Sequence, residues 1–376
     1  MRVAIIDADL IGRKNHKFPN LASMKLSGYY KKFADTVDLK LDYEGLGNYD
    51  KVFISKAFTD TPVPDYVLNM KNVEYGGTGF DYDNAVPLLP EIEHHKPDYH
   101  LYDDFVAERV QQGFKPVLFR YYTDYSVGFT TRGCFRKCQF CVNRNYSSVQ
   151  KHSPLSEFLA DDRKKLCLLD DNVLGCRDWE HILKELQATG KRFQFKQGLD
   201  IRLLDEKKCE VLFQSKYDGE FIFAFDDISE YSLIEKKLKL LRKYTNKTVK
   251  LYVFCAYDRN GIWDNNFWRQ DIFDTFKRIE LLIHQNCIPY VMRYEKYAES
   301  PYRGMYINIA SWCNMVRVIK TFTFREFCIK NGIGLSRYRY MVDFEKQFPE
   351  VSKYFDMRFE PYSKLEQGSE RSRING

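Results

Sequence analysis

Residues 131–141 read TRGCFRKCQFC, and they place Cys134, Cys138 and Cys141 on one short segment in the spacing C-x3-C-x2-C. Thiolates are the soft ligands that iron–sulfur centres use, and a [4Fe–4S] cube is usually held by four of them. Three cysteines therefore leave one iron of such a cube available to another molecule. Because this motif is compact, it is the strongest functional signal in the chain.

A repeated alternation of apolar strands and amphipathic helices surrounds this segment, which predicts parallel βα units. One predicted helix begins at Asp178 as N-cap and ends before Gly190, and another spans residues 266–284. The polar residues that follow such strands gather at one edge of a parallel sheet, where α/β proteins place their chemistry. The predicted strands are Ser126–Thr131, Lys165–Asp170, Arg192–Gln197, Glu220–Phe225, Val249–Cys255 and Cys287–Met292.

The first 120 residues predict a separate α/β unit with a parallel sheet. Val3–Ile6, Val52–Ser55 and Val73–Tyr75 have strand composition, and Leu21–Phe33 has helical composition. The last strand runs into a glycine-rich turn at residues 76–79. A turn of this kind either approaches a phosphate closely or simply bends the chain tightly, and the tight turn is the interpretation we favour.

Residues 301–376 predict a small C-terminal piece. The stretches 306–314 and 322–328 favour two short helices. The polar end, residues 366–376, is typical of a disordered tail.

Composition excludes several function classes. The net charge is only +6, from 58 basic and 52 acidic residues, so a nucleic-acid partner is not indicated. The most basic stretch, residues 236–243, carries apolar residues at helical spacing and predicts a solvated amphipathic helix. No apolar run is long enough to span a membrane, and the N-terminus predicts a strand rather than a secretory signal. We therefore expect a cytoplasmic protein without a membrane partner.

The seven remaining cysteines are scattered singly along the chain. In a reducing compartment this distribution predicts buried free thiols rather than disulfides or a second cluster. They are Cys167, Cys176, Cys209, Cys255, Cys287, Cys313 and Cys328.

The C-x3-C-x2-C motif, with the aromatic Phe140 just before the last cysteine, resembles the signature of the radical S-adenosylmethionine (SAM) enzymes. The resemblance implies an N-terminal Rossmann-like, cobalamin-binding-like domain (residues 1–120), a partial (βα)6 TIM-type barrel (121–300) and a helical cap with a polar tail (301–376). It also implies a [4Fe–4S] cluster on the three cysteines, with SAM on the open iron. The expected reaction is reductive cleavage of SAM to a 5′-deoxyadenosyl radical, which abstracts hydrogen from an unknown substrate. An electron donor such as flavodoxin or ferredoxin would be a partner.

The same resemblance suggests further site residues at the predicted strand ends. Phe140 would lie against the adenine of SAM, and Cys255 or Tyr257 would donate hydrogen to a substrate radical. The remaining candidates for cofactor binding are Asp170, Asp171, Gln197, Asp200 and Arg202. Plainer alternatives stay open: a helix N-cap for one of the paired aspartates, a structural ion pair between Asp200 and Arg202, and a buried thiol for Cys255.

Two other functions stay open. A cobalamin-dependent radical SAM methyltransferase would need an axial histidine in an Asp-x-His-x-x-Gly loop, but Asp9 occupies that position and His16 is out of register, so cobalamin is not expected. A non-catalytic zinc or iron–sulfur module would close its site with a fourth ligand such as His152.

Overall fold

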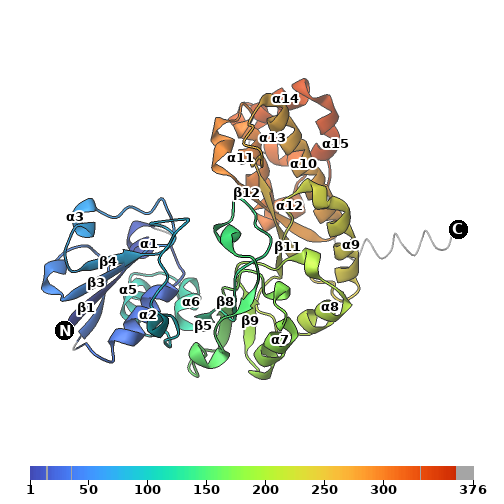
Figure 1. The fold of residues 1–376 in the computed structure, drawn as a ribbon. Coiled ribbons are helices and arrows are strands. Elements are labelled where there is room, and N and C mark those ends of the chain that lie inside the picture. Colours follow the sequence, from blue (N-terminus) through green and yellow to red (C-terminus); the bar gives the residue numbers. More distant parts are fainter. Residues whose placement is uncertain (14–15, 35, 331, 361–376) are drawn as a thin grey trace. The chain divides into compact units, whose positions relative to one another are not determined.

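The structure is a computed structural model that describes residues 1–13, 16–34, 36–330 and 332–360 (Figure 1). The chain divides into two compact units, Met1–Lys196 and Gln197–Gly376. The tail predicted at residues 366–376 lies outside the described residues. No described helix combines the length and the apolar character that crossing a membrane requires.

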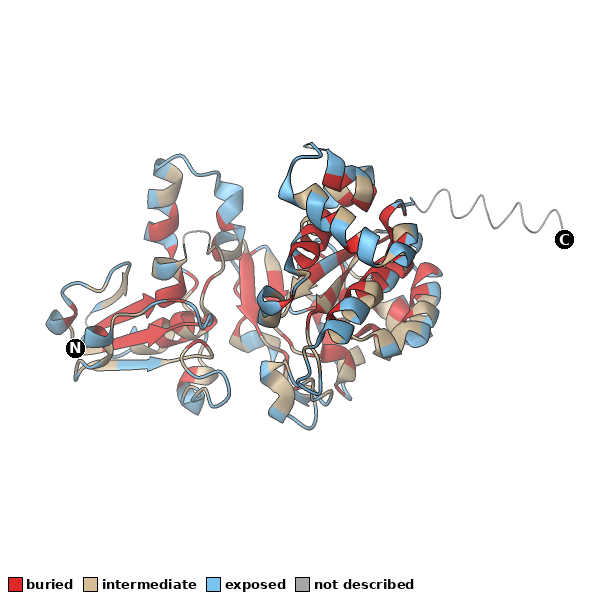
Figure 2. Ribbon diagram, turned by 90° about the horizontal axis from the view of Figure 1, so that it is seen from above, coloured by how far each residue is buried: buried red, intermediate tan, exposed pale blue. Residues whose placement is uncertain are grey.

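A four-stranded parallel sheet in the order β2-β1-β3-β4 begins the first unit. Its inner strands, β1 (Arg2–Asp7) and β3 (Lys51–Ser55), are apolar and mostly buried, as the red strands of Figure 2 show. The outer strands are β2 (Thr36–Lys40) and β4 (Val73–Gly76). The three predicted strands are therefore confirmed. The sequence did not indicate β2, because this edge strand is short and none of its residues is fully buried.

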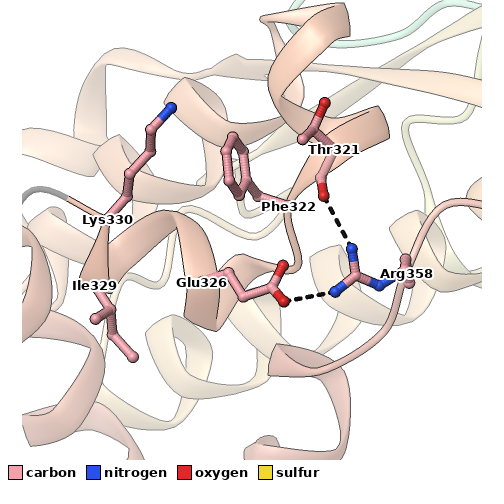
Figure 3. A pocket seen from close by; sticks show the side chains of 6 residues that line it. All are labelled: Thr321, Phe322, Glu326, Ile329, Lys330 and Arg358. Carbon is pink, nitrogen blue, oxygen red and sulfur yellow. Dashed lines mark hydrogen bonds and ion pairs between the residues drawn. The ribbon is translucent and has the colours of Figure 1, made fainter.

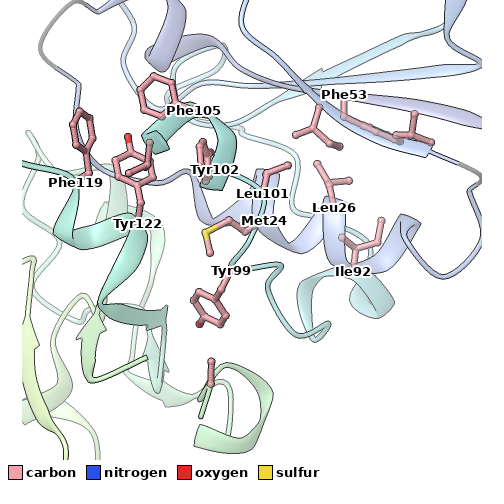
Figure 4. Close-up of a cluster of buried hydrophobic side chains, with 14 residues drawn as sticks. Met24, Leu26, Phe53, Ile92, Tyr99, Leu101, Tyr102, Phe105, Phe119 and Tyr122 are labelled. Atoms are coloured by element: carbon pink, nitrogen blue, oxygen red, sulfur yellow. The ribbon is translucent and has the colours of Figure 1, made fainter. Parts of the chain in front are cut away.

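The two faces of this sheet carry separate cores because side chains alternate along β1. Val3 and Ile5 enter one cluster, and Ala4 and Ile6 enter the other. Figure 4 shows the first cluster, in which Met24 of α2 and Tyr102 pack. The helices of this part are α1 (Ala8–Gly12), α2 (Leu21–Tyr30), α3 (Asp65–Leu68), α4 (Pro90–Glu93), α5 (Asp103–Gln111) and α6 (Arg120–Thr123), with short 3-10 turns at Leu46–Asn48 and Pro116–Phe119.

The first unit continues into a second parallel sheet in the order β5-β8-β9. Its strands are β5 (Tyr125–Gly128), β8 (Lys165–Leu168) and β9 (Arg192–Phe195), and the predicted helix α7 (Trp179–Ala188) connects the last two. Between β5 and β8, the antiparallel pair β6 (Thr131–Arg132) and β7 (Gln150–Lys151) encloses the cysteine segment. Three 3-10 turns complete this part: η3 (Val142–Asn145), η4 (Leu155–Glu157) and η5 (Val173–Gly175).

The second unit contains a parallel sheet in the order β10-β11-β12 and a helical C-terminal part. The strands are β10 (Ile222–Ala224), β11 (Val249–Cys255) and β12 (Cys287–Arg293). The helices are α8 (Glu206–Phe213), α9 (Tyr231–Arg242), α10 (Asn265–His284), α11 (Arg303–Cys313), α12 (Val316–Thr321), α13 (Phe324–Ile329), α14 (Ser336–Gln347) and α15 (Ser352–Phe355). The 3-10 turns are Ile201–Leu203, Ile228–Glu230, Glu295–Glu299 and Pro349–Val351.

Every predicted βα strand is present, so the mixed α/β class with parallel sheets is confirmed. Among the described residues these strands form two separate three-stranded sheets, one in each unit. The single (βα)6 barrel and the boundaries at residues 120 and 300 stay predictions. The basic stretch at 236–243 lies largely on α9, whose Ile234, Leu238 and Leu241 are buried as expected, whereas Leu233 is 42% exposed.

Candidate functional site: the cysteine loop

The three motif cysteines lie on the loop between β6 and η3, and they differ from every other cysteine in exposure. Cys134, Cys138 and Cys141 are half-buried, whereas the other seven are buried, and all ten are free thiols. The prediction of buried free thiols is confirmed for those seven. A reactive or ligating thiolate must be reachable, so the exposure of the motif cysteines fits ligation.

Two unusual backbone conformations shape this loop. Gly133 has φ +92°, and an added Cβ would lie 2.5 Å from the Ser148 carbonyl oxygen, so only glycine fits there. Lys137 also has a positive φ, +52°. The Cys141 N–H donates to the Cys138 carbonyl oxygen at 2.9 Å, which closes a tight turn between the last two cysteines.

Asp171, just beyond the end of β8, ties the two sides of the loop together. One carboxylate oxygen accepts from the Gly133 N–H at 2.8 Å and the other from Asn143 Nδ2 at 2.7 Å. The first contact precedes the cysteines and the second follows them. In the structure the carboxylate of Asp171 therefore braces the loop, and its role in cofactor binding stays a prediction.

Asp170 is a structural clamp in this structure, and cofactor binding by it stays a prediction. Its side chain is 1% exposed and accepts hydrogen bonds from the backbone N–H and the hydroxyl of both Thr130 and Thr131. Burial raises the pKa of this carboxyl group, against the effect of those hydrogen bonds. These contacts hold the chain just before the loop against the end of β8.

Two N–H groups point at the sulfur atoms. Asn172 Nδ2 lies 3.4 Å from Cys134 Sγ, and the Asn143 backbone nitrogen lies 3.4 Å from Cys141 Sγ. Hydrogen bonds to the sulfurs are among the devices by which proteins tune iron–sulfur clusters. The thiol donors and their N–H partners therefore fit an iron–sulfur group. No sequence signal indicated Asn143, and the sequence marked Asn172 only as a polar residue after the paired aspartates, without a role at the sulfur atoms.

A segment distant in sequence also contacts the loop. The Tyr82 hydroxyl donates to the Phe140 carbonyl oxygen at 3.1 Å, and Asp83 forms an ion pair with Arg144. Phe140 itself is half-buried on the loop. No sequence motif marks Tyr82 or Asp83, so this contact could only be found in three dimensions.

His152 does not complete a zinc site with the cysteines. Its Nε2 lies 3.3 Å from a Glu93 carboxylate oxygen, and its Nδ1 lies 3.0 Å from the Ser153 hydroxyl. Burial lowers the pKa of this imidazole to about 4. Within residues 1–13, 16–34, 36–330 and 332–360, no three Cys, His, Asp or Glu side chains lie close enough to hold one metal ion. A cube spaces its thiolates more widely, because each binds a different iron.

The three candidates that follow β9 lie in the second unit, and two of them, Asp200 and Arg202, form an ion-pair network with Glu230. Arg202 Nε lies 2.6 Å from Asp200 Oδ1, and its Nη1 lies 2.6 Å from Glu230 Oε1. This is the structural alternative that the sequence left open, and cofactor binding by either residue stays a prediction. Gln197 is exposed, two residues beyond the end of β9.

The two catalytic candidates lie at the end of β11. Cys255 is 1% exposed, and burial raises the pKa of its thiol well above the ordinary value. Its Sγ contacts the Met292 carbonyl oxygen at 3.5 Å, so it is the buried thiol of the plainer alternative. Tyr257 is half-buried, and its ring centroid lies 5.0 Å from that of Tyr294 in an edge-to-face arrangement. Hydrogen donation by either residue stays a prediction.

Sequence reasoning also missed a buried arginine at the ends of β10 and β11. Arg278 is 2% exposed, and its Nη1 donates to the carbonyl oxygens of Phe225, Asp226 and Phe254. The next turn of chain contains Ala256 at φ +64°, a strained value for alanine. These features fix the shape of the strand ends. The sequence predicted the helix that contains Arg278 but not the contacts of its side chain.

Two pockets have no predicted site residue in their lining. One of about 380 Å³ lies in the second unit and is lined by Thr321, Phe322, Glu326, Ile329, Lys330 and Arg358 (Figure 3). The other, of about 330 Å³, lies in the first unit and is lined by residues 96–100 and 160–162. Arg358 and Glu326 form an ion pair in the first pocket. None of the three motif cysteines lines either pocket, so neither carries the chemistry of the cysteine loop.

The N-terminal sheet has its own loops folded over the strand ends. Asp9, in the position of the expected axial histidine, is 1% exposed and accepts from the Ala57 N–H at 2.6 Å and the Thr61 hydroxyl at 2.5 Å. An added Cβ at Gly77 would lie 2.4 Å from the Lys56 carbonyl oxygen. The glycine turn therefore packs against the chain itself, which agrees with the tight turn that we favoured.

Comparison with known proteins gives a likeness of fold only. No family model matches the sequence, and no curated protein matches it. A solved structure of the radical S-adenosylmethionine methyltransferase TsrM from Kitasatospora setae, with cobalamin and a [4Fe–4S] cluster bound, is similar with a TM-score of 0.51 and 10% identity. The match covers 78% of this chain and 74% of that one. This chain has the fold of a radical SAM enzyme.

Two further structures match less well. TsrM from Kitasatospora setae with its tryptophan substrate and aza-SAM has a TM-score of 0.48 at 10% identity, over 74% of this chain and 71% of that one. The cobalamin-dependent SAM radical enzyme OxsB has a TM-score of 0.36 at 13% identity, over 78% of this chain and 49% of that one. The radical SAM fold therefore rests on the first match. That structure contains cobalamin, so the expectation that this chain lacks cobalamin gains no support.

Proposed function

We propose that this chain is a radical SAM enzyme that holds a [4Fe–4S] cluster on Cys134, Cys138 and Cys141. The observation that carries the proposal is the half-buried C-x3-C-x2-C loop, which Asp171 braces from both sides, within a radical SAM fold. When bound, the cluster and SAM would supply the chemistry, reductive cleavage of SAM to methionine and a 5′-deoxyadenosyl radical.

In this proposal the chain positions and tunes the reacting groups. The three thiolates would ligate three irons and leave the fourth to SAM. Asp171 and Asp170 hold the loop in its ligating shape, and the N–H groups of Asn143 and Asn172 offset negative charge on the sulfurs. The substrate stays unassigned, because no residue of the cysteine loop selects one.

The deciding experiment is anaerobic. The protein is reconstituted with iron and sulfide, reduced with dithionite and supplied with SAM, and 5′-deoxyadenosine is measured. We expect product from wild type and none from Cys134→Ala. The matched control is Cys176→Ala, which removes a buried thiol outside the loop and should keep both iron and activity. A protein that binds zinc alone, or a reducible cluster that never cleaves SAM, would refute the proposal.

Cobalamin-dependent methyl transfer is the second candidate, because the first similar structure contains cobalamin. The residues present do not fit axial ligation through the expected loop, since both Asp9 oxygens are already occupied by Ala57 and Thr61. We therefore propose that any cobalamin would bind without a histidine from that loop. Absorbance titration with hydroxocobalamin tests whether the chain binds cobalamin at all. Stoichiometric binding, followed by methyl transfer from SAM after an added low-potential reductant has taken the bound cobalamin to the Co(I) state, would favour the methyltransferase.

A further inference from the structure

Asn172 is fixed beside the first cysteine by its own surroundings. Asn172 is 3% exposed, and its backbone carbonyl oxygen accepts a hydrogen bond from the Gly175 N–H at 2.9 Å in the turn η5. An added Cβ at Gly175 would lie 2.7 Å from the Phe135 ring and 3.5 Å from Asn172 Cγ. Close packing therefore limits the directions in which the amide can point, and its Nδ2 faces Cys134 Sγ at 3.4 Å.

The amide group of Asn172 is costly to the fold. Its Oδ1 is buried and has no hydrogen-bond partner among the described residues. A buried unsatisfied acceptor destabilises the folded state, and an apolar side chain of similar size would avoid that cost. The hydrogen bond to Cys134 is the polar contact that the amide does make. A role at the sulfur atom accounts for an amide at this position better than packing does.

We propose that Asn172 is a positioning residue that raises the reduction potential of the cluster through Cys134. The inference rests on the proposed function, in which Cys134 ligates the cluster. Accepting one electron from a low-potential reductant takes the cluster from the 2+ to the 1+ state and adds negative charge to its sulfurs. An N–H donor stabilises the more negative state, so it makes reduction easier.

The test is a potentiometric titration of the reconstituted cluster, followed by electron paramagnetic resonance. Asn172→Leu keeps the approximate size and removes the donor, so one hydrogen bond to a charged group is lost. We expect reduction to become about three- to tenfold less favourable, which corresponds to a midpoint about 30–60 mV more negative. Asn172→Asp also removes the donor and adds a charge, so its shift should have the same sign and be larger.

The control is Asn145→Leu, the same substitution at an exposed position after the motif, which should leave the midpoint unchanged. Unchanged midpoints in both Asn172 variants, with cluster content equal to wild type, would overturn the inference and leave the proposed function intact. If both variants fold, by circular dichroism, but hold no cluster, Asn172 acts in loop assembly instead, and the inference is again overturned. A wild type that forms no cluster would refute the proposed function itself.

Discussion

At the residue scale, the three cysteines could be read from the sequence, but the residues that hold them could not. A ligand motif is local, so its spacing survives in the sequence. The bonds from Asp171 to Gly133 and Asn143 join residues 38 and 28 positions apart, and no spacing rule predicts such pairs. For the same reason the sequence did not predict the structural contacts of Asp170 and Asp171, because a carboxylate that follows a strand can bind a ligand, a loop or both.

Removal of the Asp171 side chain tests the brace. Asp171→Ala leaves the Gly133 N–H and Asn143 Nδ2 without their acceptor, so we expect less iron and sulfide bound after reconstitution and faster protease cleavage within 133–143. Asp178→Ala is the control, because Asp178 forms an exposed ion pair with Lys151, and such pairs contribute little to stability. Full cluster loading and unchanged cleavage in Asp171→Ala would show that the loop needs no brace.

At the element scale, strands and long helices were predicted well, because burial imposes a clear apolar pattern on them. The edge strand β2 escaped detection because its residues are only partly buried. The helices α12 and α14 were also missed, since each buries few of its residues. The strand ends were harder still: the shape after β11 depends on Arg278 from α10, and a helix sequence does not reveal which strand it will contact.

The hydrogen bonds that Asp170 accepts at the end of β8 should contribute measurably to the free energy of unfolding. Asp170→Ala would leave the buried N–H and hydroxyl donors of Thr130 and Thr131 without an acceptor. We expect the free energy of unfolding to fall by about 3 kcal/mol. Urea denaturation measures this loss. Asp161→Ala, at an exposed position before β8, should change it by less than about 0.5 kcal/mol. Equal effects of the two substitutions would contradict a clamp.

The end of β1 should make stability depend on pH. Asp7 is 1% exposed and accepts from the Tyr102 hydroxyl at 2.9 Å, and burial raises its pKa from 3.8 to about 7. The folded state therefore binds this proton more tightly than the unfolded state, so the free energy of unfolding falls as pH rises between those two values.

The amide of an Asp7→Asn variant cannot titrate, so the free energy of unfolding of this variant should depend less on pH. Above pH 7 it should exceed the wild-type value by at most about 4 kcal/mol. Thermal melts from pH 4 to pH 8 measure the effect. Asp9→Asn, whose carboxylate accepts two strong hydrogen bonds, should instead be destabilising. A wild-type melting temperature that rises steadily over this range would contradict the assignment.

At the scale of the whole molecule, the sequence predicted the fold class, because strand–helix alternation is a property of the entire chain. The division of the chain into two compact units at Lys196 and Gln197 is not visible in the sequence. Buried contacts between distant residues decide that, and the first unit runs to Lys196, with Phe119, Tyr122 and Ala160 in the same core cluster as Val3 and Ile5.

Thiol exposure gives a test for the whole chain. In the folded, metal-free protein, N-ethylmaleimide should modify three of the ten cysteines quickly, and all ten should react in denaturant. Peptide mapping by mass spectrometry identifies the sites, which should be Cys134, Cys138 and Cys141. Reconstitution with iron and sulfide should protect those three. Rapid reaction at a buried position such as Cys313 would contradict the packing of the second unit.

The bonds from Asp171 to both sides of the cysteine loop have a consequence for the protein's lifetime in air. These bonds join a carboxylate, a side-chain amide and a backbone N–H of the protein itself, so none of them needs iron in order to form. If oxidation removed a bound cluster, the cysteine loop would then keep its folded conformation. Such a protein would be able to take up iron and sulfide again without first refolding.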